Sequence, residues 1–236
     1  STLARLSSSA IALSKKFLPA APGAEKNTQE PGLMVRLGAR TVVAATLRAV
    51  QLLGRQFVLG QTIEEGMAEA GAARRKQPNL SYSYDMLGEG ARTDADALQY
   101  LASYQNAIKK IAEKVHKTLG TERNDGISIK LSALHPRYEA TQQARVLREL
   151  VPRVWSLCEL AARANISLTI DAEEVDRLEL SLDVFEALAE QVAQHYPQWR
   201  GFGLAMQSYQ TRALALIEHV IALARKYRLR FMCRLC

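Results

Sequence analysis

From residue 80 onward, five short strand-like segments alternate with segments that have the 3.6-residue period of amphipathic helices. The strand-like segments are Leu80–Asp85, Ile127–Ala133, Ser167–Asp171, Gly201–Gln207 and Arg230–Cys236. Strands joined by helices form parallel sheets with right-handed crossovers, so the pattern predicts an α/β fold. A complete eight-unit βα barrel needs roughly 250 residues, and this stretch has room for about four units and a fifth strand. The pattern therefore fits either an open five-stranded sheet or part of a barrel.

Helix signals separate these strands. The first helix begins at Thr93 with a capping-box arrangement that includes Asp96, and Gly120 is its expected C-terminal stop. The second runs from about Thr141 to Ala164, and Pro152 should kink it or split it in two. The apolar stripes expected to face the core are, helix by helix, Leu98, Leu101, Ile108, Ile111 and Val115; Leu147, Leu150, Val154, Cys158 and Ala161; Val184, Leu188 and Val192; and Leu214, Ile217, Ile221 and Ala224.

Residues 1–79 are helical in character, and we expect them to form an α-helical arm or small domain ahead of a domain at 80–236. Helices are predicted over Leu3–Leu18, over Leu33–Leu53 and from Thr62 toward Arg75, with a polar linker at Ala24–Pro31. One helix face carries Arg36, Arg40, Arg48 and Arg55, opposite an apolar face with Val43, Leu47 and Val50. Such a basic stripe suits either the solvated side of a packed helix or a membrane surface.

Composition narrows the possible partners. The chain has a net charge of +7 and a pI near 9.4, but its basic residues are spread along the sequence. We find no helix-turn-helix, zinc-finger or RNA-binding signature, so we predict no nucleic-acid partner. No run of 18 apolar residues is present to span a membrane. Three cysteines without a paired framework indicate a reducing compartment, so we expect a cytoplasmic location.

A polar or charged side chain lies near the carboxyl end of every predicted strand. These residues are Asp85, Lys130, Asp171, Gln207 and Arg234. A charge inside a buried strand is costly unless a partner neutralises it. In parallel α/β folds the carboxyl ends of the strands form the active face. We therefore expect these five side chains to line the floor of a polar cavity.

Other apparent motifs are weaker. Cys233 and Cys236 have the spacing of a redox or zinc motif, but residues three apart in a strand point to opposite faces, so we predict no metal site. The pair Gly88 and Gly90 lacks the remaining residues of a phosphate-binding loop and is more typical of a turn. His135 is a possible base, although a loop histidine before proline more often caps or lies at the surface.

Several motifs together resemble one family, the proline dehydrogenase domain of the bacterial bifunctional proline utilization A flavoenzymes. The motifs are YSYDMLGE at Tyr82–Glu89, ISIKLSALHPRYE at Ile127–Glu139, TIDAEE at Thr169–Glu174, DRLELSL at Asp176–Leu182 and GFG at Gly201–Gly203 with Gln207. The helical segment Leu53–Ile63 resembles the region just before that barrel. The resemblance runs from about residue 33 to the C-terminus.

The resemblance implies a partial (βα)8, TIM-like barrel that binds FAD and oxidises L-proline to 1-pyrroline-5-carboxylate by hydride transfer to the flavin. It implies Lys130 and Asp171 on the substrate side, with Gln207 and Arg234 hydrogen-bonded to the flavin ring. Glu89 resembles the acidic half of a gate over the active site. Electrons would pass to a membrane quinone, which implies peripheral association with the inner membrane; a homo-oligomer is a further expectation.

The sequence departs from the family pattern at its end. After Cys236 the family has three more strands and a last helix with arginines that grip the substrate carboxylate, so we expect a truncated chain that lacks activity alone. Two other readings stay open at this point. One is a Schiff-base barrel enzyme that uses Lys130, and the other is a non-catalytic fragment that folds with a partner chain.

Overall fold

The computed structural model describes residues 43, 44, 46–48, 50, 54, 58–116 and 118–236. Two compact units divide the chain, Ser1–Gln61 and Thr62–Cys236, and each is considered by itself. In the first unit, residues 43, 44, 46–48 and 50 are helical, in agreement with the helix predicted over Leu33–Leu53. The predicted helix Leu3–Leu18, the linker Ala24–Pro31 and the side chains of Arg36, Arg40 and Arg55 lie outside the described residues. The division at residue 79 stays a prediction.

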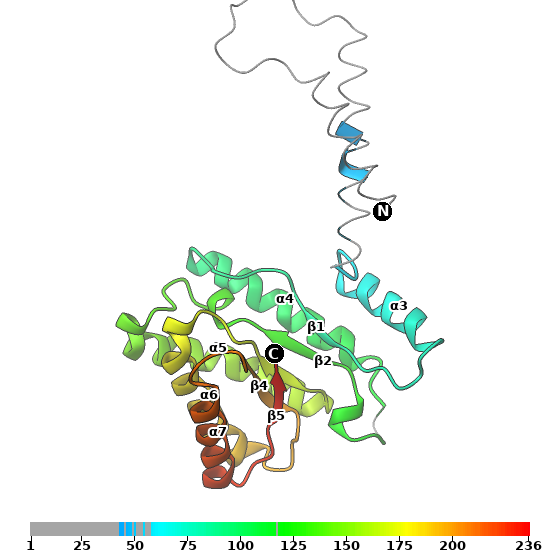
Figure 1. The fold of residues 1–236 in the computed structure, drawn as a ribbon. Helices are drawn as coiled ribbons and strands as arrows, with labels where there is room; N and C mark the ends of the chain where they lie inside the picture. Colours follow the sequence, from blue (N-terminus) through cyan, green and yellow to red (C-terminus); the bar gives the residue numbers. More distant parts are fainter. Residues whose placement is uncertain (1–42, 45, 49, 51–53, 55–57, 117) are drawn as a thin grey trace, which may run out of the picture. The chain divides into compact units, whose positions relative to one another are not determined.

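The second unit is built on a five-stranded parallel sheet whose spatial order follows the chain, β1-β2-β3-β4-β5 (Figure 1). The strands are β1 (Ser83–Asp85), β2 (Gly126–Ile129), β3 (Leu168–Ile170), β4 (Phe202–Met206) and β5 (Met232–Leu235). All five predicted strands are therefore present, although each is shorter than predicted. The α/β fold with parallel strands is confirmed.

Five helices accompany the strands. They are α3 (Ile63–Arg74), α4 (Asp94–Ala112), α5 (Gln143–Ala164), α6 (Leu178–His195) and α7 (Ala213–Tyr227). Because consecutive strands are neighbours and parallel, right-handed crossovers place the connecting helices on the same side of the sheet. That arrangement is the wall of a βα barrel.

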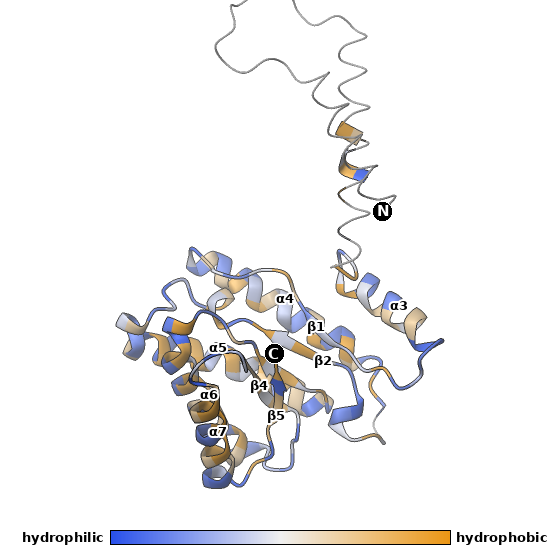
Figure 2. Cartoon of the chain, in the orientation of Figure 1, coloured by the Kyte–Doolittle hydropathy of each residue, from blue (hydrophilic) through white to orange (hydrophobic). Residues whose placement is uncertain are grey.

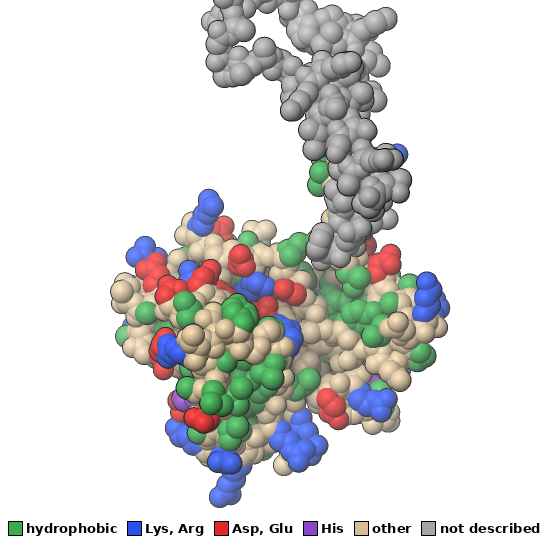
Figure 3. Space-filling model, viewed as in Figure 1, with side chains coloured by type: hydrophobic (Ala, Val, Ile, Leu, Met, Phe, Trp, Pro, Cys, Tyr) green, Lys and Arg blue, Asp and Glu red, His purple; other side chains and the backbone are tan. Residues whose placement is uncertain are grey.

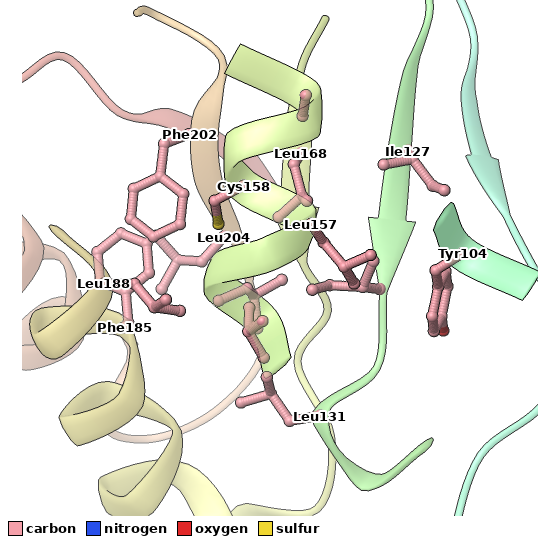
Figure 4. Packing of buried hydrophobic residues seen from close by; sticks show 14 of the residues in the cluster. Tyr104, Ile127, Leu131, Leu157, Cys158, Leu168, Phe185, Leu188, Phe202 and Leu204 are labelled. Atoms are coloured by element: carbon pink, nitrogen blue, oxygen red, sulfur yellow. The ribbon is translucent and has the colours of Figure 1, made fainter. Parts of the chain in front are cut away.

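The core lies where these helices meet the sheet, and Figure 2 shows hydrophobic residues gathered there. Ile127 and Leu168 of adjacent strands are fully buried, and in Figure 4 Leu157 of α5 lies beside Leu168 while Ile127 points toward Tyr104. At the far side the rings of Phe185 and Phe202 stack with their centroids 4.7 Å apart. The inward stripes predicted for the second and third helices are confirmed, although Leu147 is only partly buried. The buried residues of these stripes are Leu150, Val154, Cys158, Ala161, Val184, Leu188 and Val192.

Two predicted boundaries are wrong. The strand predicted to continue to Ala133 ends at Ile129, and Leu131–Ala133 forms a 3-10 helix. Local backbone hydrogen bonds replace those between strands there. The Ala133 amide donates to the Lys130 oxygen (3.2 Å), and the Leu134 amide donates to the Leu131 oxygen (3.0 Å). The helix predicted to stop at Gly120 ends at Ala112, so Val115 lies beyond it.

Two helix faces also differ from prediction. In α4 the predicted residues Ile108 and Ile111 are buried, but the predicted Leu98 is 55% exposed, and the buried side also carries Ala97, Tyr104 and Ala107. In α7 the predicted residues Leu214 and Ile221 are 71% and 44% exposed. The buried residues of α7 are Leu216, Val220 and Leu223. Figure 3 shows hydrophobic side chains exposed over the α6 and α7 region of the viewed face.

The predicted capping box of α4 and the predicted effect of Pro152 on α5 have different outcomes. The Thr93 hydroxyl accepts a hydrogen bond from the Asp96 amide, and the Asp96 carboxylate accepts one from the Thr93 amide, which confirms the capping box. Of the two outcomes expected at Pro152, a kink or a split of the second helix, the split is wrong, since α5 is continuous through Pro152. Pro152 is exposed, and the lost hydrogen bond costs less where water reaches the freed carbonyl.

Candidate active site

Alternation along the strands assigns polar side chains to the helix-free face of the sheet. Ile127 and Ile129 are buried in the core between sheet and helices. Side chains in a strand point alternately to opposite faces, so Ser128 and Lys130 share the other face. Asp85 is paired with Ser128 in the ladder, and Thr169 is also paired with Ser128 from the other side. The carboxyl ends of neighbouring strands therefore present these polar groups side by side.

Four charged side chains meet at this edge of the sheet. The Lys130 ammonium donates to Asp85 Oδ1 and Oδ2 at 3.1 and 2.9 Å and to Asp171 Oδ2 at 3.0 Å. The Arg234 guanidinium donates to Asp171 Oδ1 at 2.5 Å. Asp171 thus bridges the two cations, and its side chain is 9% exposed. We name Asp85, Lys130, Asp171 and Arg234 the charged cluster.

The charged cluster is electrically balanced, with two carboxylates and two cations. Burial lowers the pKa of the Lys130 ammonium, but hydrogen bonds and the charges of Asp85 and Asp171 more than offset it and raise the pKa. Burial likewise lowers the pKa of Arg234, but hydrogen bonds and charge interactions with Cys236 and Asp171 more than offset it and raise the pKa. Both side chains are therefore firmly cationic at neutral pH, and the cluster is suited to a ligand that carries both a positive and a negative group.

Neutral residues hold the charged cluster in place. Ser128 is 1% exposed, and its hydroxyl contacts Arg234 Nη1 at 2.9 Å and the Ser83 hydroxyl at 2.9 Å. The Tyr104 hydroxyl from α4 accepts a hydrogen bond from the Lys130 amide at 3.1 Å. Burial raises the pKa of Tyr104 to about 12, so its hydroxyl stays protonated. Sequence reasoning missed these three residues, although Ser128 lies two positions before Lys130 and the alternation could have identified it.

The other two predicted site residues lie apart from the charged cluster. Gln207 follows β4 and donates to the Glu173 backbone oxygen at 3.4 Å, while its own side-chain oxygen accepts from Gln210 at 3.3 Å. Glu89 lies on the exposed loop after β1 and forms no ion pair within the described part of the chain. The structure therefore brings together Asp85, Lys130, Asp171 and Arg234, but neither Gln207 nor Glu89.

A pocket opens beside the charged cluster at the carboxyl ends of β3 and β4. Its lining includes Asp171, Glu173, Gln207 and Tyr138, with apolar walls from Phe185 and Leu216. Burial raises the pKa of Glu173, whose side chain is 10% exposed. Sequence reasoning also missed Glu173, because one of two adjacent glutamates in a loop has no distinguishing pattern.

His135 has a structural role. It is buried, its Nδ1 accepts from the Arg137 amide at 3.1 Å, and its Nε2 lies 3.2 Å from Glu149 Oε2. Cys233 and Cys236 are free and exposed. Among the described residues no cluster of histidine, cysteine, aspartate and glutamate could hold a metal ion. Within the same residues, no helix has the length and apolar character needed to cross a bilayer.

A parallel sheet with helices along one side and charged groups at the strand carboxyl ends defines an α/β enzyme of the βα-barrel type. The sequence profile of one family, Proline dehydrogenase, matches residues 68–236. The chain belongs to the proline dehydrogenase family of oxidoreductases.

Individual relatives agree with this assignment. The bifunctional protein PutA of Escherichia coli is 48% identical over 187 residues, which is 79% of this chain and 14% of that protein. The bifunctional protein PutA of Rhizobium meliloti is 43% identical over 203 residues, 86% of this chain and 16% of that protein. A crystal structure of Bradyrhizobium japonicum proline utilization A is 45% identical with a TM-score of 0.69, covering 90% of this chain and 22% of that one. The chain thus spans a small part of these relatives.

Proposed function

We propose that these residues serve the FAD-dependent oxidation of L-proline to 1-pyrroline-5-carboxylate. The observation that carries the proposal is the balanced charged cluster at the carboxyl ends of β1, β2, β3 and β5, in a chain of this family. Proline is a small zwitterion, so its ammonium and carboxylate complement a site that offers both carboxylates and cations.

Lys130 and Asp171 are the proposed substrate-side residues. The Lys130 ammonium, fixed between Asp85 and Asp171, would attract the proline carboxylate. The Asp171 carboxylate, held on both sides by cations, would orient the substrate nitrogen. Such fixed charges reduce the reorganisation needed during reaction, which is how preorganised sites lower barriers.

The residues at β4 and β5 fit a flavin. Arg234 offers a guanidinium that is 44% exposed and oriented by Asp171 and Ser128, and Gln207 offers a neutral amide on the adjacent strand end. When bound, FAD supplies the ring that accepts the hydride from proline. Arg234 would hold positive charge where negative charge arrives with that hydride, and Gln207 would orient the ring by hydrogen bonding.

The remaining roles extend this proposal. Glu89 would act as the acidic part of a gate at the mouth of the site, since it lies on the loop directly after β1. A quinone would take up the electrons, which would require transient contact with a membrane surface from the cytoplasmic side. Association into a homo-oligomer is compatible with these roles.

A Schiff-base enzyme that uses Lys130 is disfavoured by one observation. An amine attacks a carbonyl only in its neutral form, and enzymes therefore lower the pKa of such lysines. The two carboxylates beside Lys130 raise its pKa instead. Borohydride should consequently trap no carbonyl substrate on Lys130.

The test uses a chimera in which residues 68–236 of this chain replace the matching segment of Escherichia coli PutA, a relative at 48% identity. We expect proline-dependent dye reduction within about tenfold of the parent enzyme. A chimera that folds and retains FAD but shows no proline-dependent reduction would refute the proposal, and would favour a non-catalytic role for the segment.

A further inference from the structure

Glu173 joins the loops that follow three consecutive strands. Its carboxylate oxygen Oε1 accepts the Ser132 amide of the β2 loop at 3.0 Å. The other oxygen lies 3.6 Å from Arg177 Nη1, and the Arg177 guanidinium lies 5.6 Å above the centroid of the Tyr138 ring, which also follows β2. The Glu173 backbone oxygen accepts from Gln207 after β4 at 3.4 Å. Glu173 thus connects the ends of β2 and β3 through its carboxylate, and the end of β4 through its backbone oxygen.

Ser132 extends the connection to the loop after β1. Its hydroxyl accepts the Gly90 amide at 3.1 Å, and its backbone oxygen accepts the Ala91 amide at 2.9 Å. Ser132 is 4% exposed, and its hydrogen bond with the Gly90 amide is partly buried. Every polar group of Ser132 is therefore used to hold a neighbouring loop.

The segment held by Ser132, Gly88–Gly90, has an unusual backbone conformation on both sides of Glu89. Gly88 and Gly90 adopt φ angles of 146° and 61°, which residues with a side chain rarely adopt. A Cβ at Gly88 would also collide with the ring of Tyr100. Glu89, in contrast, has an exposed side chain between two glycines whose conformation is set by their surroundings.

We propose that Ser132 and Glu173 are positioning residues that fix the segment Gly88–Gly90, and with it the Glu89 carboxylate, at the carboxyl end of the sheet. The role of Glu89 in this inference rests on the proposed function. Glu173 holds the Ser132 amide, Ser132 holds the Gly90 amide, and Gly90 follows Glu89 directly. The free energy spent on burying the Glu173 carboxylate is offset only while these donors stay in place.

The first measurement is amide hydrogen exchange on the 236-residue chain, without FAD or proline. Ser132→Ala removes the acceptor of the Gly90 amide, and Glu173→Ala removes the acceptor of the Ser132 amide. Each should accelerate exchange at Gly90 about tenfold or more, because the segment opens locally. Glu173→Gln keeps a carbonyl oxygen for Ser132 and should restore exchange to within about threefold of the original chain.

Two variants are matched controls. Ser156→Ala removes a part-buried hydroxyl that donates to the Arg153 oxygen, and Glu186→Ala removes a carboxylate bound to Lys226 and Tyr227. Neither should alter exchange at Gly90. The inference is wrong if Ser132→Ala accelerates Ile127 in β2 as much as Gly90, or if Glu173→Gln behaves like Glu173→Ala.

A second measurement separates positioning from general stability. In the chimera, Ser132→Ala should raise the KM for proline about fivefold and lower kcat by a smaller factor, because a displaced gate impairs capture of substrate. A fall in kcat with an unchanged KM would contradict the inference. Failure of the chimera to oxidise proline refutes the proposed function instead, and the exchange result still decides the inference about Gly88–Gly90.

Discussion

Lys130 lies between two carboxylates, so its removal leaves Asp85 and Asp171 to repel each other. We predict that Lys130→Ala or Asp171→Ala in the chimera lowers proline turnover more than tenfold, a loss of over about 1.4 kcal/mol of transition-state stabilisation. FAD content should be retained, since neither residue is assigned to the flavin. Lys110→Ala, which removes only a surface pair with Glu113, is the control. Unchanged proline oxidation in both site variants would refute the assignment.

His135 links stability to pH. Burial lowers its pKa despite the opposing effect of Glu149, so the native state holds the neutral ring. The unfolded chain, with an ordinary pKa of about 6.5, binds the proton more readily. The free energy of unfolding should therefore fall as the pH is lowered from about 7.5 to 5.

The His135→Asn variant tests this dependence, because an asparagine oxygen can still accept the Arg137 amide. Urea unfolding of the variant should show a lower stability at pH 7.5 and a flatter profile between pH 7.5 and 5. An equally steep profile in the variant would assign the effect to other groups.

Individual site residues were predictable where a charged side chain occurs in a strand that is otherwise apolar. A lysine or aspartate at the end of an apolar strand stands out, which is how Lys130 and Asp171 were identified. Ser132 and Glu173 were missed because their importance comes from contacts between loops 41 residues apart in the chain. Serine and glutamate in a loop are ordinary in a sequence, and only the folded arrangement reveals their shared hydrogen bond.

At the scale of secondary-structure elements, substitutions in α7 test which face of that helix packs against the core. Leu223 is 4% exposed and Leu214 is 71% exposed, although the two are of the same type on one helix. Leu223→Ala should lower the free energy of unfolding by about 2–5 kcal/mol. Leu214→Ala should change it by no more than about 0.5 kcal/mol. The reverse order in urea unfolding would mean that the predicted stripe, and not the observed one, faces the core.

The ambiguity in α7 has a physical origin. The helix carries apolar residues on more than one face, so two stripes with helical spacing, one through Leu214 and one through Leu216, both occur in the sequence. Periodicity alone cannot choose between them. In α5 and α6 the apolar residues form one stripe, and there the prediction was correct.

The end of the chain gives a second prediction at this scale. Cys233 in β5 and Cys236 just after it are both exposed and unpaired, and residues three apart along a strand point to opposite faces. We predict less than about 0.1 zinc per chain after dialysis, because a zinc site needs several converging ligands. Metal analysis that finds about one zinc per chain would contradict this, and a Cys233→Ser sample gives the background.

At the scale of the whole molecule, the order of strands and helices was predictable because it depends on periodicity and on the handedness of crossovers. The domain division at residue 79 stays a prediction; α3 lies before that position and falls in the same compact unit as the sheet. Helices near a boundary have the same sequence pattern whichever unit they pack against.

The central claim is that the charged cluster of Asp85, Lys130, Asp171 and Arg234 is where proline is oxidised. The most direct measurement mixes the FAD-loaded chimera with L-proline without oxygen and follows the flavin absorbance in a single turnover. We predict that the flavin is reduced in the chimera and that Asp171→Ala slows this reduction more than tenfold. Reduction at an unchanged rate in Asp171→Ala, or none in a chimera with full FAD content, would contradict the account.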